Sequence, residues 1–282
     1  MFQRSIDLFK ACWHVLRSDK ELIWFPVIST IAMIVVTVLF LLPASALLGI
    51  FGASAGAEMD SGSPLAMVLF FLWSFVAYSV SLYFNVALIG AALKRLDGGD
   101  PTLSDGIAIA NARLGKILQY AAISAFISLV LNQIRERGGL LGSLFAGLLE
   151  FGWNVITFLV LPVLIVQDVS PIEAIKTSTA MLKKTWGEQL VGNLGMGLVF
   201  FVAYLGLFIA AGLLIWLSAN VSGVLVVIVV IAAIVAFAAI SAIANALGGI
   251  YRAMLYRYAE TGHVGVGEMD TLLSGAFVSK KK

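Results

Sequence analysis

The chain alternates short amphipathic segments with long apolar runs. The clearest amphipathic segment is SPIEAIKTSTAMLKKTW, residues 170–186, in which Ser170, Pro171 and Glu173 predict a helix start with a capping box. Apolar residues then recur on one helical face and lysines lie away from it: Ile172, Ile175, Leu182 and Trp186 on the first, Lys176, Lys183 and Lys184 on the second. This pattern is typical of a helix that lies in a membrane interface.

The same pattern occurs twice more along the chain. Lys10 and Arg17 in the first segment have the same offsets as Lys176 and Lys183 in the third. A weaker middle copy, LSDGIAIANARLGK at residues 103–116, keeps the acidic position but has small residues in place of the basic ones. We therefore expect three interface helices in the chain, each introducing a pair of membrane spans.

Six apolar runs approach or exceed the roughly 20 residues that a helix needs to cross a bilayer. The predicted spans cover, approximately, residues 22–48, 65–93, 117–134, 140–166, 190–217 and 224–249. With their interface helices they form one membrane domain, 1–259, of three units at about 1–95, 101–166 and 169–259, followed by a cytoplasmic tail, 260–282. The predicted fold class is an all-α polytopic transmembrane bundle with six spans, three cytoplasmic amphipathic helices and a pseudo-threefold repeat.

The composition agrees with a membrane protein. Of 282 residues, 61% are hydrophobic and only 12% are charged, about half the charged share of a soluble domain. The net charge of +2 is small and its basic residues are dispersed, which argues against nucleic-acid binding. The single cysteine, Cys12, cannot form an internal disulfide or a thiolate metal cluster, so we expect no metal and no cofactor.

The basic residues predict the orientation of the chain. All 18 lysines and arginines except Arg135 and Arg137 fall in the segments assigned to one side. By the positive-inside rule this places both termini in the cytoplasm and the protein in the cell (inner) membrane. The interface helices would then lie on the cytoplasmic leaflet, where their basic residues meet anionic headgroups, so membrane lipids are the expected partners.

An acidic residue occupies the same place in each unit, namely Asp7, Asp105 and Glu173. A ring of three carboxylates is one reading of this repetition. The simpler reading is that each residue caps a helix and opposes the helix dipole. We expect capping.

Glu150 is the best candidate for a site inside the membrane. A charge there costs roughly 2.5–3.5 kcal/mol, which the apolar neighbours in its span outweigh. Asn154 lies one turn on, on the same face, and Trp153 is adjacent. Two readings stay open: these residues form a functional polar site, or Glu150 reaches the outer headgroups or pairs with Arg135 or Arg137.

Small and amide side chains mark the expected helix contacts. Spans 5 and 6 carry small residues at helical spacing that favour close packing, either within one subunit or across a dimer face: Gly192, Gly195, Gly197, Ala238, Ser241, Ala242, Ala246 and Gly249. Three asparagines, Asn85, Asn193 and Asn245, are expected to form hydrogen bonds between helices.

One sequence match to an enzyme motif is rejected. Residues 52–56, GASAG, fit GxSxG, but that motif needs a strand-to-helix turn and a histidine partner. The match lies in a small-residue loop on the outer side, whereas both histidines, His14 and His263, are assigned to the cytoplasm. The sequence therefore predicts no hydrolase.

The chain resembles an uncharacterised prokaryotic family of polytopic membrane proteins, a domain of unknown function. Five stretches spread over nearly the whole chain carry the resemblance: SIDLFKACWHVLRSDKELIWFPVIS, GGDPTLSDGIAIA, TFLVLPVLIV, EAIKTSTAMLKKTWGEQLVGN and LYRYAETG. More distantly, the chain is similar to the membrane domain of some glycerophosphodiester phosphodiesterases. The final GVGEMD departs from the Pro, Gly, Phe, Asp ending more usual in the family. The resemblance implies no catalytic residues.

Two functions of different class follow from these observations. The first is a non-enzymatic, lipid-associated scaffold or accessory membrane module. The alternative is a transporter or permease-like protein for a small or lipidic solute, with Glu150 and Asn154 in a cavity. A homo-oligomer or an unidentified membrane partner is compatible with both.

Overall fold

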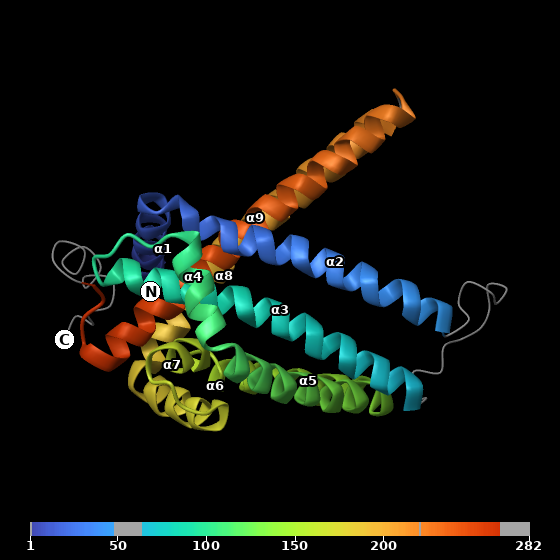
Figure 1. The fold of residues 1–282 in the computed structure, drawn as a ribbon. Coiled ribbons are helices and arrows are strands. Elements are labelled where there is room, and N and C mark those ends of the chain that lie inside the picture. The colour runs from blue at the N-terminus through green and yellow to red at the C-terminus, as the bar shows by residue number, and fades with distance from the viewer. Residues whose placement is uncertain (1, 48–63, 220, 266–282) are drawn as a thin grey trace.

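The computed structural model describes residues 2–47, 64–219 and 221–265, and the regular structure within these ranges is entirely helical (Figure 1). The side chains of residues 2–5, 41–47, 65–66, 184–195 and 219 lie outside this description. The elements are α1 (Phe2–Ser18), the 3-10 helix η1 (Lys20–Ile23), α2 (Trp24–Leu47), α3 (Pro64–Leu96), α4 (Leu103–Ala112), α5 (Leu114–Arg137), α6 (Gly139–Ile156), α7 (Val160–Val166), α8 (Pro171–Ala219) and α9 (Gly223–Thr261). The predicted all-α class is confirmed.

Six segments in the described ranges are long and apolar enough to cross a bilayer. They are Lys20–Phe40, Met67–Leu96, Leu114–Arg137, Gly139–Val166, Met196–Ser218 and Gly223–Thr261. Each one overlaps a predicted span, so the chain has the architecture of a multi-pass membrane protein. Large apolar side chains on the outer parts of these helices are exposed, as lipid-facing surfaces are.

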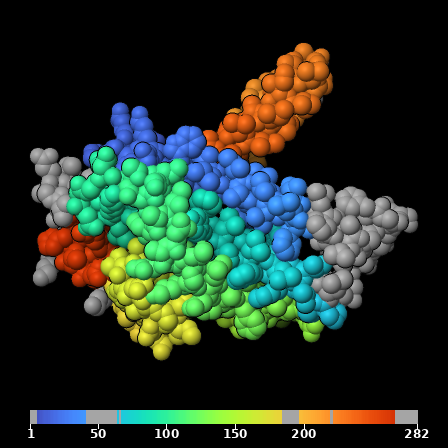
Figure 2. Space-filling view, viewed as in Figure 1, coloured from blue at the N-terminus to red at the C-terminus, as the bar shows by residue number. Residues whose placement is uncertain are grey.

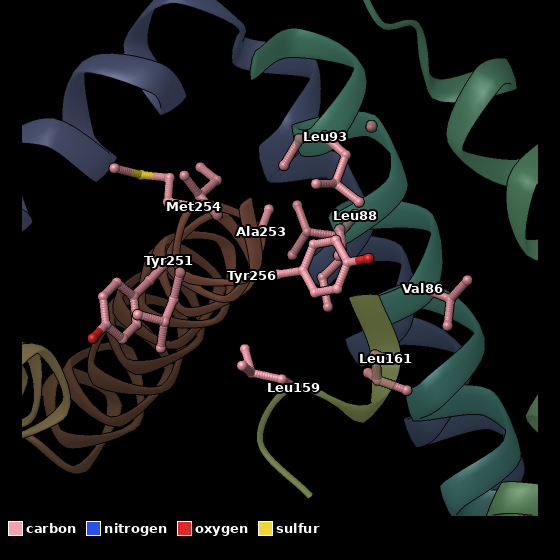
Figure 3. Packing of buried hydrophobic residues seen from close by; sticks show 14 of the residues in the cluster. Val86, Leu88, Leu93, Leu159, Leu161, Tyr251, Ala253, Met254 and Tyr256 are labelled. Carbon is pink, nitrogen blue, oxygen red and sulfur yellow. The ribbon is translucent and has the colours of Figure 1, made fainter. Parts of the chain in front are cut away.

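The buried core lies at one end of the molecule, which we call the hub. It combines α1, the start of α2, the end of α3, α7 and the C-terminal part of α9. Figure 3 shows part of this core, with Leu88 and Leu93 of α3, Leu161 of α7 and Met254 of α9. From the hub the spans extend outward, and α8 and α9 leave together as an arm that diverges from α2, α3 and α5 (Figures 1 and 2).

Helix α1 packs against the protein with one apolar face and exposes another. Ile6 and Trp13 are exposed, whereas Leu16 is buried. A second apolar face, with Leu8 and Cys12, is buried against α8 and α9. The Cys12 thiol donates a weak hydrogen bond to Met254 Sδ at 3.7 Å, so the first helix is fastened to the last.

Two glycines let α4 cross α3 closely. A Cβ on Gly106 would lie 2.4 Å from the Phe25 ring and 2.8 Å from the Ala87 carbonyl oxygen. A Cβ on Gly90 of α3 would lie 2.8 Å from Ile109 Cγ2 on α4. The absence of side chains at these two glycines lets the backbones of α3 and α4 come close together. Helix α4 therefore packs on the hub through this close contact as well as through its apolar face.

The predicted caps are confirmed at two of the three acidic positions. Thr102 and Asp105 form a capping box at α4, and Ser170 Oγ donates to Glu173 Oε2 at 2.9 Å at α8. Asp7 does not cap a helix, because α1 already begins at Phe2 and has no acidic residue in its first turn. The hydrogen bond from Lys94, followed by those from Thr102, holds the pKa of Asp105 well below its ordinary value.

The third amphipathic segment is not a helix of its own. Helix α8 runs without interruption from Pro171 to Ala219, because no proline follows Pro171 to end it. Its first turns bury Ala174, Ser178 and Leu182 against the protein. Ile172 and Leu182 were predicted to share one membrane-facing side, but only Ile172 is exposed, at 61%. The boundary expected near residue 186 is therefore wrong, although the amphipathic character is present.

The fourth span, predicted as one helix, is broken. Helix α6 ends at Ile156 and α7 begins at Val160. Pro162 explains the break, since its ring clashes with the carbonyl four residues earlier and it has no N–H to donate. Ser178 of α8 satisfies the freed groups: its hydroxyl donates to the Ile156 carbonyl at 2.7 Å and accepts from the Leu159 N–H at 3.2 Å.

Helices α8 and α9 pack along each other, as the small residues predicted. Tyr204 Oη lies 3.0 Å from Ser241 Oγ, and the Tyr204 and Phe237 rings are 5.2 Å apart. The prediction is wrong for Gly249, which faces α3, since a Cβ there would lie 2.4 Å from Leu88 Cδ2. It is also wrong for Gly197, where a Cβ would meet nothing within 4 Å, and for Ala238, which is exposed. The side chains at 192 and 195 lie outside the described residues, as does the GASAG loop.

Candidate functional site

A cavity of about 790 Å³ lies between α3, α5, α6 and α9. Its wall includes a polar stripe along one face of α5, made by Tyr120, Ser124, Ser128, Asn132 and Arg135. These residues recur every three or four positions and so share one side of the helix. The stripe extends from Tyr120 to Arg135, or about 22 Å of helix, which is most of the roughly 30 Å hydrocarbon thickness of a bilayer.

The three residues predicted as an intramembrane site, Glu150, Asn154 and Trp153, all line this cavity. Glu150 is not isolated, because Arg135 Nη2 lies 2.8 Å from Glu150 Oε2. The side chains of Arg135 and Glu150 are 45% and 51% exposed, so the pair stands at an open edge of the cavity. Of the two readings left open by the sequence, pairing with Arg135 is therefore observed, and it occurs within the cavity wall.

The other end of the cavity is formed by the break between α6 and α7. Thr157 and Phe158, in the non-helical turn, line the cavity together with Tyr120 of α5 and Arg252 of α9. The Arg252 guanidinium carbon lies 5.2 Å from the centre of the Phe158 ring, in a cation–π contact. Irregular backbone between membrane spans is tolerated where protein covers it or where it lines a cavity, and Thr157 and Phe158 are partly buried in the cavity wall.

Arg252 is partly buried and lacks a full set of partners. Its Nε is shielded from solvent and has no hydrogen-bond acceptor among the described residues. No ion pair joins Arg252 to an acidic side chain in that part of the chain. A cation in this state is unusual, since buried charges are normally paired.

Two asparagines separate this cavity from a smaller one. Asn85 and Asn245 line both the large cavity and a second one of about 240 Å³ between α2, α3 and α9. Their amide groups donate within their own helices, to the Ser81 and Ser241 carbonyls at 2.8 and 2.9 Å. The predicted interhelical hydrogen bonds are therefore not formed by these two residues, because each amide returns to the carbonyl one turn earlier. Asn193 lies outside the described side chains.

The basic residues predicted for the interface helices are at the surface where they are described. Lys10, Arg17, Lys176 and Lys183 are all exposed, whereas the side chains of Lys184 and Trp186 lie outside the description. These residues are distributed over α1 and α8 at the hub and do not line the large cavity.

A separate ionic cluster joins the second unit to the start of α8. Asp168 accepts from Arg113 at 2.9 Å and from Lys116 at 2.5 Å. The hydrogen bond from Lys116 is the main cause that lowers the pKa of Asp168. Arg113 also donates to the Ile165 carbonyl at 3.2 Å, so the loop between α7 and α8 is fixed to the α4–α5 joint.

Sequence reasoning missed Arg252 and the polar stripe of α5. Arg252 follows an apolar run directly and was assigned to the cytoplasmic end with the other basic residues of that segment. A polar residue every three or four positions along Tyr120 to Arg135 was the available signal for the stripe. No group of three or more metal-binding side chains occurs within residues 2–47, 64–219 and 221–265.

Comparison with known proteins gives one family. The family described as "Family of unknown function (DUF6159)" matches residues 64–266, which include everything from α3 through α9. No curated protein matches the chain.

Proposed function

The chain belongs to the Family of unknown function (DUF6159), and from this premise we propose that it is a non-enzymatic, lipid-associated membrane module that holds a polar group between its spans. The observation that carries the proposal is the cavity of about 790 Å³, whose wall combines neutral hydroxyls and amides with the Arg135–Glu150 pair and Arg252. Cavities of about 300–1,000 Å³ with a few convergent polar groups are typical of small-molecule sites.

The proposal requires that water and polar solutes reach the cavity. Ser128→Cys places a nearly isosteric thiol on the α5 stripe, in a Cys12→Ala background. This thiol should react with a hydrophilic maleimide in nanodiscs. Leu148→Cys, on the outward face of α6, should stay unreactive because that side chain is 71% exposed to the lipid side, and Asp100→Cys in the α3–α4 loop should react at once. Complete protection of a folded Ser128→Cys protein would contradict the proposal.

The non-enzymatic part of the proposal has its own test. The purified protein in nanodiscs is expected to leave phospholipid and phosphodiester substrates unchanged over hours. Turnover that disappears in Glu150→Gln or Arg252→Gln would show that the protein is an enzyme.

A transporter or permease-like role for a small or lipidic solute is the second candidate. It is favoured by the length of the polar stripe and by the broken fourth span, since transporters bind substrates at discontinuous helices. Single cysteines at Ser124 and Asn132, near the two ends of the stripe, would be labelled from opposite sides of a sealed vesicle in a transporter. Labelling of both from one side only would favour a binding module instead.

The proposed location is the inner membrane with both termini in the cytoplasm and with membrane lipids as partners. The distribution of basic residues and the exposed Lys10, Arg17, Lys176 and Lys183 support it. Packing of α1 against the C-terminal part of α9 is in keeping with an even number of spans. Reporter fusions after α9 are expected to report the cytoplasm.

The distant likeness to the membrane domain of glycerophosphodiester phosphodiesterases stays a prediction about architecture alone.

A further inference from the structure

We infer that Arg252, with the hydroxyls around it, forms a binding site for a phosphate group at the hub end of the large cavity. The inference deepens the proposed function and rests on it, because it names the chemical class that the cavity holds. Its basis is the juxtaposition of a partly buried guanidinium whose Nε has no acceptor among the described residues, a cavity of sufficient size and neutral hydrogen-bond donors in the same wall.

The first step concerns charge. Among the residues that line the cavity the acidic side chain is Glu150, and it is already paired with Arg135 at 2.8 Å. The Tyr120 end of the α5 stripe, near Arg252, lies about 22 Å of helix from the Arg135 end. Glu150 therefore cannot neutralise Arg252, and the hub end of the cavity carries an uncompensated positive charge.

The second step concerns geometry. The Phe158 ring covers one face of the guanidinium at 5.2 Å, which orients the group without using its N–H donors. The Nε atom has no acceptor among the described residues. A guanidinium presents its N–H groups in the plane of a fork, and this fork matches two oxygens of a phosphate or carboxylate.

The third step separates phosphate from carboxylate. Tyr120 and Ser124 of α5 bring hydroxyls to the same end of the cavity, whereas the Thr157 hydroxyl already donates to the Trp153 carbonyl at 2.7 Å. A phosphate has oxygens left over after a two-point contact with arginine, and hydroxyl donors can bind them. A carboxylate has both oxygens occupied by the fork and would leave these hydroxyls unused. The arrangement therefore fits a phosphate better.

The phosphate group has two sources, a phospholipid headgroup and a soluble phosphate compound. The test uses the purified full chain in a maltoside detergent, which carries no phosphate. Binding of dioctanoyl phosphatidic acid and of inorganic phosphate is measured separately by native mass spectrometry and by thermal unfolding. Binding of the lipid alone supports the inference with a headgroup as the source, and binding of inorganic phosphate supports it with a soluble source.

The variants decide whether Arg252 is responsible. Arg252→Gln should weaken binding of the active probe at least about tenfold. Arg257→Gln is the control, because Arg257 lies on α9 like Arg252 but is paired with Asp97 and does not line the cavity. This variant should change binding of the active probe less than about twofold. Without any probe, Arg252→Gln should unfold at the same temperature as the natural protein or higher, because it removes an uncompensated charge. A merely structural arginine would instead give a lower unfolding temperature.

Other outcomes overturn the inference. They are failure of both probes to bind, equal binding by Arg252→Gln, or a lower unfolding temperature of a folded Arg252→Gln protein without probe. If Arg252→Gln does not fold, Arg252→Lys and Ser124→Ala decide, since each should weaken binding and unchanged affinity in both contradicts the site. A water-accessible cavity that binds neither probe refutes this inference alone, whereas an inaccessible cavity refutes the proposed function.

Discussion

Arg135 and Glu150 are 15 residues apart in the sequence, yet Arg135 Nη2 lies 2.8 Å from Glu150 Oε2 across the turn between α5 and α6. The pair joins the polar stripe of α5 to the residues predicted as a site on α6. Both side chains are about half exposed, so their attraction is screened wherever water or headgroups reach them. The pair therefore positions charge at the cavity edge more than it stabilises the fold.

The first prediction tests this pair. Glu150→Arg alone should lower stability by about 0.2–1 kcal/mol through repulsion with Arg135, and Arg135→Glu alone should do the same. The double swap should recover most of the loss, since the ion pair is re-formed with reversed polarity. Thermal unfolding in nanodiscs of the four proteins measures the coupling. Strictly additive losses would mean that the observed contact contributes nothing in the membrane.

The second prediction concerns the closest approach of α9 to α3. Gly249→Ala should destabilise the protein by about 1–3 kcal/mol, because the new methyl group meets Leu88 Cδ2 at 2.4 Å. Gly248→Ala is the matched control, since a Cβ at 248 meets nothing within 4 Å. Adding Leu88→Ala should partly rescue Gly249→Ala. Similar unfolding temperatures for the two alanine variants would rule out this packing.

The third prediction concerns the broken span. Ser178→Ala should cost about 1–3 kcal/mol, because it leaves the Leu159 N–H and the Ile156 carbonyl buried without their hydrogen bonds. Thr179→Ala is the comparison, as its hydroxyl bonds only the Ile175 carbonyl of its own helix. Hydrogen exchange at Leu159 should rise selectively in Ser178→Ala. An unchanged exchange rate at Leu159 would contradict the role given to Ser178.

The fourth prediction is a pH dependence at the start of α4. The pKa of Asp105 is lowered from 3.8, chiefly by the hydrogen bond from Lys94, so the folded state favours the ionised carboxylate. The stabilisation that the ionised Asp105 carboxylate gives the folded state is complete above pH 3.8. It is lost as the pH falls through the lower pKa that Asp105 has in the folded state. Amide exchange in the first turn of α4 should increase in acid. Asp105→Asn should exchange faster at neutral pH and should lose this acid response.

The fifth prediction concerns Cys12. Burial raises the pKa of its thiol to about 12, so at pH 8 only about one molecule in ten thousand carries the reactive thiolate. Native protein should resist N-ethylmaleimide for hours, and denatured protein should react fully. Mass spectrometry of the labelled protein measures this. Rapid labelling of the native chain would show that α1 separates from Met254.

The membrane architecture could be predicted from the sequence because long apolar runs and capping boxes are local signals. The positions of all six spans and the caps at Asp105 and Glu173 depend on short stretches of chain. The prediction for Asp7 is wrong because it came from the equivalent positions of Asp7, Asp105 and Glu173 in the three repeats. A capping role depends instead on the residue at which the helix begins. The break before Pro162 was also missed, although proline was a local warning.

The site depended on tertiary packing that periodicity alone does not give. Glu150 could be singled out, since a carboxylate in an apolar run is rare, and its pairing with Arg135 was one of the expected alternatives. Arg252 could not be assigned to the cavity, because a cation just after an apolar run has the same sequence pattern at the membrane surface. Only the packing of α9 beside the α6–α7 break brings it into the cavity wall.

The divergence of the α8–α9 arm from the other spans has a consequence for handling the protein. The outer parts of these two helices are supported by each other and expose large apolar side chains such as Phe208, Ile234 and Val235. In a bilayer, acyl chains fill the wedge beside the arm and press it laterally toward the hub. A micelle supplies little lateral pressure, so solubilisation in short-chain detergents should loosen this arm before it affects the hub.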